Sequence, residues 1–303
     1  MTADKHQQLQ AQIKKLDSIS TAPAILKPLL DILRQPAENV PFDKVVELAS
    51  YDGAIAAQCL RLANSPLVGS RQIETVRTAI AALGIERVRS MLFGVCVNQV
   101  IPKEKWVLDP VAFWRHSLGC ALVTQRMAKG IGYPEPDKAY LAGLLHDLGF
   151  LVNSILYNED FRKCLKLALD RRSALGLCET EILGFTHCES GQLLAEHWGL
   201  PHELSETARY HHDVTELKNA GPLVCLVHLS DLLCRVCNLG YGYEEILSVE
   251  LGRDSAWIPL VTAYPALSEV DLVRFTLDIE GAMDQIVTTV DSVFGKTAAA
   301  GKS

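Results

Sequence analysis

The residues of this chain best suited to chemistry are seven histidines and aspartates between residues 116 and 231. They occur in order as a single histidine, a His-Asp pair, a second single histidine, a His-His pair and an aspartate. These residues are His116, His146, Asp147, His187, His211, His212 and Asp231. Imidazole and carboxylate groups are ligands of divalent transition ions such as Fe, Mn and Zn. The set is therefore a candidate metal site, provided that the fold brings the side chains together.

The His146-Asp147 pair shows why these groups need a partner. It lies in an otherwise apolar run, LAGLLHDLGF, at residues 141–150. A polar group buried without a hydrogen bond costs about 2–7 kcal/mol. The pair must therefore contact either a metal ion or other polar groups of the protein, and the sequence alone leaves both interpretations open.

Taken singly, the histidines are weak indicators. A lone histidine in an apolar helix is more often a hydrogen-bonded core residue than a ligand, and this holds for His116 or His187 alone. His6, His197 and His202 lack a partner pattern, so they are interpreted as surface or packing residues. Only the ordered pattern of all seven residues indicates a common site.

The elements that must position these side chains are predicted to be helices. Apolar residues recur at spacings of three and four, and alternation of period two is absent. Asp109-Pro110 combines a capping aspartate with a proline at the first helical position, which predicts a helix start. Further helices are predicted over residues 138–156, 179–200, 223–237 and 269–294. The fold class is therefore all-α, a multi-helix bundle, in which converging helices can direct side chains to one interior point.

The domain organisation is predicted as two helical lobes and an extension. Residues 100–110, VIPKEKWVLDP, contain two prolines and a cluster of charges, a composition typical of a boundary. We expect an N-terminal helical lobe at residues 1–105 and a second lobe at residues 106–240, which holds eight of the nine histidines. Residues 241–303 would form a C-terminal helical extension that ends in a disordered tail, GKTAAAGKS.

Composition argues against several classes of partner. The net charge is −7 and no basic stripe is present, which argues against nucleic-acid binding. The longest apolar stretch, residues 222–237, is shorter than the roughly 20 residues of a membrane span, and the N-terminus has no signal-peptide core. Nine scattered cysteines, including a CxxC at residues 234–237, are interpreted as reduced core residues of a cytoplasmic protein.

With these residues in place, the chain resembles the HD superfamily of metal-dependent phosphohydrolases and, within it, the HDOD family. The N-terminal half carries the more specific part of the resemblance: STAPAILKPLLDIL, LRLANSP and IETVRTAIAALG. The segments ESGQLLAEHWGLP and ARYHH are also similar, and the resemblance extends over about residues 16–235. It implies an all-α regulatory module of bacterial signalling proteins, which acts by binding other signalling proteins.

The resemblance also implies a ligand set for one or two ions of Fe, Mn or Zn. One ion would be held by His116, His146, Asp147 and Asp231. A second ion would share Asp147 and add His187, His211 and His212.

The chain departs from the catalytic relatives at three points. Phe150 stands where cyclic-dinucleotide phosphodiesterases have a lysine, the Gly-Tyr-Pro loop is missing after His212, and Ala112 replaces an acidic ligand. Removing one positioned donor costs about 2.7–4 kcal/mol of transition-state stabilisation. Arg115 or Arg235 could substitute for the lysine, although a surface salt bridge is the simpler interpretation of either.

Two hypotheses remain. The first is a regulatory signalling module that retains a metal and has little or no catalytic activity. The second is a working phosphohydrolase that acts on a nucleotide or a cyclic dinucleotide. If Phe150 borders a solvent-open cavity, Phe150→Lys would change stability little and would restore some affinity for phosphate.

Overall fold

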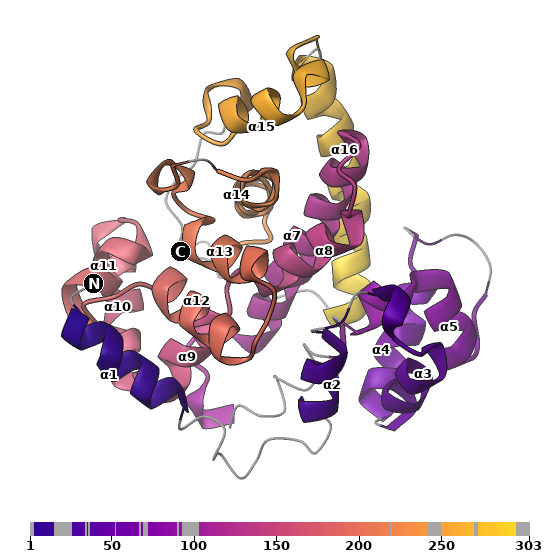
Figure 1. Ribbon diagram of the computed structural model, residues 1–303, viewed down its shortest axis with the longest axis horizontal. Helices are drawn as coiled ribbons and strands as arrows, with labels where there is room; N and C mark the ends of the chain where they lie inside the picture. Colours follow the sequence, from indigo (N-terminus) through magenta and orange to yellow (C-terminus); the bar gives the residue numbers. More distant parts are fainter. Residues whose placement is uncertain are drawn as a thin grey trace.

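All regular elements among the residues that the structure describes are helices, as the sequence predicts (Figure 1). The computed structural model describes residues 3–14, 26–33, 35, 37–51, 53–66, 68, 72–89, 91–92, 103–218, 220–241, 250–269 and 272–294. The tail predicted to be disordered, residues 295–303, lies outside them. The first elements are α1 (Ala3–Ile13), α2 (Leu26–Leu33), η2 (Ala37–Asn39), α3 (Phe42–Tyr51), α4 (Gly53–Ala63), α5 (Val76–Leu83) and η3 (Lys103–Lys105).

The remaining elements carry the predicted ligands and the C-terminal segment. They are α7 (Pro110–Gly130), α8 (Pro136–Leu145), α9 (Gly149–Leu156), α10 (Asn158–Arg171), α11 (Leu175–Ile182), α12 (His187–His197), α13 (His202–Tyr210), η4 (Val214–Glu216), α14 (Pro222–Val236), η5 (Leu251–Arg253), α15 (Trp257–Ala263), η6 (Pro265–Glu269) and α16 (Leu272–Phe294). The long C-terminal helix thus begins at Leu272, after the short η6, rather than at residue 269.

Helix α7 occupies the centre of the second lobe. It begins where the sequence predicts, because the Asp109 carboxylate accepts a hydrogen bond from the Val111 amide at 2.9 Å and Pro110 lies in the first turn. Helices α8, α14 and α16 pack against it (Figure 1). Buried residues therefore occur around most of its circumference, and His116 lies in the interior of the lobe.

The stretch predicted as one helix over residues 138–156 is divided into α8 and α9. The chain turns at residues 146–148, so His146 and Asp147 lie in the break between two helices. Gly149 permits a close approach directly after the break: a Cβ atom there would lie 1.8 Å from the carbonyl oxygen of His187. The start of α9 can thus pack directly against the start of α12, and this contact brings Asp147 close to His187.

The stretch predicted as one helix over residues 179–200 is also divided. Helix α11 is followed by Gly184 with φ of +77°, a backbone conformation that favours glycine. Thr186 then starts α12 with a capping box, in which Glu189 Oε2 accepts a hydrogen bond from the Thr186 amide at 2.8 Å. His187 is consequently the first residue of α12, where its side chain is held at the helix end.

The two ends of the described chain pack against parts distant in sequence. Helix α1 contacts α12 in the second lobe and buries Leu9 and Ile13 (Figure 1). Helix α16 contacts α7 in the second lobe and also α4 in the N-terminal lobe, so it connects the two lobes. The domain boundaries at residues 105 and 240 stay predictions.

One apolar stretch, Pro136–Leu156, has the length and mean hydropathy of a membrane-spanning segment. Within the molecule, 89% of its apolar window is buried. It comprises α8, the turn at residues 146–148 and α9, which pack against α7 and α12. Core helices have the same composition, so the stretch is weak evidence for a membrane span.

Candidate metal centre

The seven predicted site residues come together in the second lobe. His116 lies on α7, His146 and Asp147 lie between α8 and α9, and Asp231 lies on α14. His187 begins α12, while His211 and His212 follow the last residue of α13. Each of the seven has a nitrogen or oxygen atom within 3.7 Å of such an atom in another member.

Three of the seven residues lie together with a cysteine thiol and are fully buried. We call these four residues the inner donor group: His116, Cys120, His146 and Asp231. Its members are at most 2% exposed. The Nε2 atom of His116 lies 3.3 Å from Nε2 of His146 and 3.2 Å from Oδ1 of Asp231. The donor atoms of the group all lie within 4.8 Å of one another, which is close enough for one ion to contact them together.

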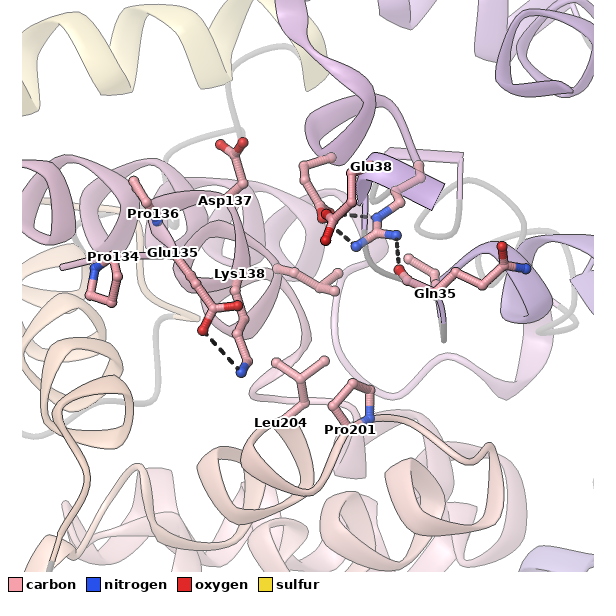
Figure 2. Close-up of a pocket in the computed structure, with 13 residues that line it drawn as sticks. Gln35, Glu38, Pro134, Glu135, Pro136, Asp137, Lys138, Pro201 and Leu204 are labelled. Atoms are coloured by element: carbon pink, nitrogen blue, oxygen red, sulfur yellow. Dashed lines mark hydrogen bonds and ion pairs between the residues drawn. The ribbon is translucent and has the colours of Figure 1, made fainter. Parts of the chain in front are cut away.

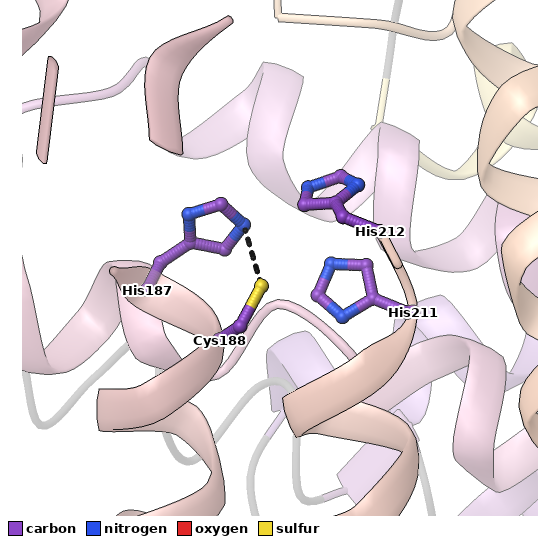
Figure 3. A group of neighbouring side chains, drawn as sticks. All are labelled: His187, Cys188, His211 and His212. Atoms are coloured by element: carbon purple, nitrogen blue, oxygen red, sulfur yellow. Dashed lines mark hydrogen bonds between the residues drawn. The ribbon is translucent and has the colours of Figure 1, made fainter. Parts of the chain in front are cut away.

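A second group of four residues reaches the surface at one residue, and we call it the outer donor group: His187, Cys188, His211 and His212. Figure 3 shows the four side chains converging from α12 and from the end of α13. Their donor atoms also lie within 4.8 Å of one another. His187 and His211 are buried, whereas the His212 side chain is 37% exposed. Solvent can therefore reach the outer group at His212.

Asp147 lies between the two groups and presents one carboxylate oxygen to each. Its Oδ2 atom lies 3.1 Å from Nε2 of His146 and 3.5 Å from Nε2 of His116. Its Oδ1 atom lies 3.4 Å from Nε2 of His211 and 3.7 Å from Nε2 of His187. A carboxylate in this position can bridge two cations, one on either side.

Four imidazoles are oriented by hydrogen bonds at their outward-facing nitrogens. Nδ1 of His116 donates to the Leu239 carbonyl at 2.8 Å, and Nδ1 of His146 donates to the Gly143 carbonyl at 2.8 Å. Since a carbonyl oxygen only accepts, each Nδ1 carries a proton, and Nε2 is the nitrogen that faces the centre and would bind a metal.

The two imidazoles of the outer group follow the same pattern. Nδ1 of His211 donates to the Ala208 carbonyl at 3.0 Å, and Nδ1 of His187 donates to Oε2 of the buried Glu179 at 2.7 Å. Metal-binding histidines are typically held in this way, because the second hydrogen bond fixes the tautomer and the ring orientation.

Buried polar atoms without a hydrogen-bond partner indicate whether this set of residues suits a bound cation. Among the described residues, Oδ1 of Asp147, Nε2 of His211 and Oδ2 of Asp231 are buried without a hydrogen-bond partner. Burial, followed by the neighbouring His212, lowers the pKa of His211 to about 3, so its imidazole is neutral at pH 7. An acceptor nitrogen thus faces an acceptor oxygen across 3.4 Å. A cation between such atoms would satisfy both, and the donor set therefore fits a divalent transition metal.

The charge state of Asp147 agrees with this fit. Burial alone would raise the pKa of its carboxyl group, but the charge and hydrogen bond of His146 hold it well below its ordinary value of 3.8. The group is therefore a carboxylate at neutral pH, as a metal ligand must be.

Several residues at the centre escaped the sequence analysis. The Tyr241 hydroxyl donates to Oδ2 of Asp147 at 2.5 Å, and its ring centroid lies 4.5 Å from that of His116. The thiols of Cys120 and Cys188 each lie beside a histidine of the set. For Tyr241, no sequence signal was available, because it follows α14 in a segment without a motif.

A connection to the C-terminal segment was also missed. Nδ1 of the buried His228 donates to the carbonyl of His211 at 2.6 Å, and its Nε2 lies 3.1 Å from Oδ1 of Asp254. Asp254 also accepts the Ala256 amide at 2.8 Å, near the start of α15. His228 of α14 thus holds the backbone of a predicted ligand, and Asp254 of the segment after α14 holds His228. The spacing of His228, three residues before Asp231 on an apolar helix, could have drawn attention to it.

The Phe150 side chain is buried and does not meet the condition of bordering a solvent-open cavity. The Phe150 side chain is 1% exposed and stacks on the His187 ring with centroids 4.2 Å apart. Its ring also meets Tyr241 edge-on at 5.4 Å. Phe150→Lys is therefore expected to reduce stability, because the Phe150 side chain packs in the core.

The two candidate arginines are placed differently from a surface salt bridge. Arg115 is 6% exposed and forms an ion pair with Asp291 of α16. Arg235 lies at the site itself, with Nη1 3.6 Å from Oδ2 of Asp231. Of these two arginines, only Arg235 has its guanidinium close to the side chain of a predicted ligand.

A separate cavity of about 430 Å³ lies between the two groups of helices, away from the histidines (Figure 2). Its lining includes Glu86 and Arg89, which form a buried ion pair, and Lys138, which pairs with Glu203 at 2.7 Å. Arg89 also donates to the Gln35 carbonyl at 2.6 Å. These charged side chains pair with one another. None of the charged groups named here is therefore left to bind a ligand in the cavity.

Comparison with known proteins agrees with this architecture. The HDOD domain model matches residues 19–214. An uncharacterized protein of Treponema pallidum (strain Nichols) is 26% identical over 260 residues, which are 81% of this chain and 49% of that protein. The chain thus spans about half the length of this curated relative.

Two solved structures are similar over nearly their whole length. An HDOD domain protein of unknown function from Geobacter sulfurreducens has a TM-score of 0.76 and 25% identity, and the match covers 95% of this chain and 98% of that one. A proposed phosphohydrolase from Shewanella amazonensis has a TM-score of 0.68 and 21% identity, with 93% and 98% covered. The second likeness shows the fold alone.

Proposed function

Because this chain belongs to the HDOD family, we propose that it is a signalling module that binds divalent transition metal and regulates partner proteins, with little or no hydrolysis. The family match extends over residues 19–214. The inner and outer donor groups would hold one or two ions of Fe, Mn or Zn. In hydrolytic relatives, such an ion polarises a phosphate oxygen and activates water. In this chain we assign it mainly a structural role.

The observation that carries the proposal is the position of Asp147. One of its oxygens faces the inner donor group and the other faces the outer donor group, both through Nε2 atoms of anchored imidazoles. Its Oδ1 atom has no hydrogen-bond partner among the described residues. A hydrogen-bonded core would leave this arrangement unsatisfied, whereas cations would satisfy it.

The same geometry supports the expectation of weak catalysis. Phe150 fills the position of the phosphodiesterase lysine with an apolar ring that stacks on His187. The Tyr241 hydroxyl already bonds Oδ2 of Asp147. Both residues keep water and positive charge away from this side of the centre, whereas phosphoryl transfer depends on positioned positive charge.

The test of metal binding is direct. Protein purified without chelator and without a histidine tag should contain about one to two Fe, Mn or Zn per chain by elemental analysis, as mixed imidazole and carboxylate ligands suggest. Apo protein should take up added Zn²⁺, Mn²⁺ or Fe²⁺. Protein that contains no metal and takes up none would overturn the proposal.

A phosphohydrolase is the second candidate, and one observation favours it. Nδ1 of the partly exposed His212 and Nη1 of the partly exposed Arg235 both lie near Oδ2 of Asp231, at 3.3 and 3.6 Å. A small phosphate group could approach the outer donor group there and bind the guanidinium. This function would require a nucleotide or cyclic dinucleotide to enter from that edge.

Turnover separates the two candidates. Metal-loaded protein should show little or no hydrolysis of cyclic dinucleotides and of a panel of nucleoside phosphates. A rate near the enzyme median of about 10 per second would favour the phosphohydrolase. Arg235→Ala should then abolish most of that rate, while Arg253→Ala, at an exposed arginine outside the centre, should leave it unchanged.

A further inference from the structure

Two thiols lie at the metal centre, although the resemblance assigns neither of them to a ligand set. Cys120 follows His116 by one turn of α7 and is completely buried. Cys188 is the second residue of α12, directly after His187, and is 6% exposed. Each thiol belongs to a different donor group, so the inner and the outer group each have one sulfur atom.

Three separations between donor atoms have the lengths found around a tetrahedral zinc ion. Zn–S and Zn–N bonds of about 2.3 and 2.05 Å place sulfur and nitrogen roughly 3.6 Å apart, and two nitrogens roughly 3.3 Å apart. Sγ of Cys120 lies 3.5 Å from Nε2 of His116, and Sγ of Cys188 lies 3.6 Å from Nε2 of His187. The two inner imidazole nitrogens lie 3.3 Å apart.

The two thiols are oriented differently toward the centre. Sγ of Cys188 lies on the side of His187 that faces His211 and His212 (Figure 3). Sγ of Cys120 lies 3.5 Å from Nε2 and 3.9 Å from Nδ1 of His116, so it lies over the imidazole ring. Cys188 therefore already faces the centre, whereas Cys120 would have to rotate about its Cα–Cβ bond to join the ligands.

We propose that Cys120 and Cys188 are ligands of the metal centre and that they select Zn²⁺ over Mn²⁺. This inference rests on the proposed metal-binding function. Each donor group then supplies the four ligands of a structural zinc site, and the shared Asp147 would add a fifth, a coordination number that zinc also adopts. Thiolate is a soft ligand that favours zinc, whereas manganese prefers oxygen. Each thiol releases its proton to solvent when it binds the ion.

The experiment loads apo protein with Co²⁺, which takes the place of Zn²⁺ and reports its ligands by absorption. Wild-type protein should show a thiolate-to-Co²⁺ charge-transfer band in the near ultraviolet. Cys120→Ala and Cys188→Ala should each lose part of the band, and the double variant should lose all of it. Cys164→Ala is the matched control, because Cys164 is an equally buried thiol on α10, outside both donor groups.

Competition binding gives a second measurement. The double variant should bind Zn²⁺ at least about tenfold more weakly, while its affinity for Mn²⁺ should change by less than about threefold. Wild-type protein that binds Co²⁺ without a thiolate band would overturn this inference and leave the metal-binding proposal intact. Protein that takes up no metal would overturn both. The wild-type band does not depend on the folding of any variant, so the inference stays testable if the double variant fails to fold.

Discussion

The inner and outer donor groups contain similar ligands but differ in their access to solvent. The inner group lies among α7, the α8–α9 turn and α14, and its members are at most 2% exposed. The outer group lies at the ends of α12 and α13, and its His212 side chain is 37% exposed. Buried ligands hold an ion as part of the core, whereas ligands at helix ends near solvent allow exchange. We therefore expect a structural ion in the inner group and an exchangeable ion in the outer group.

The largest expected effect comes from removing the residue that both groups share. Asp147→Ala leaves several imidazoles facing each other without their buried carboxylate, and breaking a buried ionic contact costs about 3–5 kcal/mol. In thermal unfolding, the variant should melt well below wild type, and a chelator should lower the wild-type melting temperature towards that of the variant.

Asp160→Ala serves as the control, because Asp160 is exposed and pairs only with the exposed Lys163 among the contacts described. An Asp147→Ala variant that melts like wild type, together with a chelator that has no effect, would contradict the structural role of the metal.

A slightly smaller effect is expected at Phe150, which covers the outer group. Phe150→Lys removes a ring stacked on His187 and places an ammonium group in the core, so we expect a loss of about 3 kcal/mol in urea unfolding. Phe150→Leu retains apolar volume and should cost roughly half as much. A lysine variant as stable as wild type would show that the site opens more readily than its burial indicates.

The two groups can be compared directly through one histidine from each. His116→Ala should lower the free energy of unfolding by about 1–3 kcal/mol, because it leaves buried partners unsatisfied. His212→Ala should change stability by less than about 0.5 kcal/mol, since this side chain is partly exposed. Elemental analysis should show that His212→Ala retains the inner ion and loses the outer one. Equal losses of stability and of metal in both variants would remove the distinction between the groups.

The smallest expected effect concerns His228, which holds the His211 carbonyl. Burial alone would lower the pKa of His228, but the hydrogen bond and charge of Asp254 raise it above its ordinary value of 6.5. The protonated pair therefore stabilises the fold below pH 6.5, and this contribution is lost as pH rises through the elevated pKa. Asp254→Asn should reduce stability at pH 6 by about 0.5–1 kcal/mol and flatten its decline towards alkaline pH.

Urea unfolding at several pH values measures this effect. The asparagine side chain of the Asp254→Asn variant would still be able to cap the Ala256 amide, so the comparison isolates the charge. Asp160→Asn, at an exposed position, should leave the pH profile unchanged. A profile for Asp254→Asn identical to that of wild type would mean that His228 positions His211 without being protonated.

Much of the fold could be predicted because its signals are local. The Asp109-Pro110 start of α7 depends on two adjacent residues, and the absence of period-two alternation agrees with the helices of the described residues. The breaks at residues 146–148 and 183–186 were missed, since they depend on local turn chemistry within apolar runs, and the first is followed by the close contact of Gly149 with His187.

The seven histidines and aspartates were recognisable from their types and order, because metal-competent side chains in apolar helices need partners. The residue types and spacing alone did not give their division into two groups around Asp147, which only the family resemblance implied, because it depends on distances between α7, α12, α13 and α14. The same holds for the thiols, for Tyr241 and for the burial of Phe150. The sequence by itself determined the helical fold class and the chemistry available to the centre. Only the tertiary structure decided which atoms share one site, because packing of distant helices sets those distances.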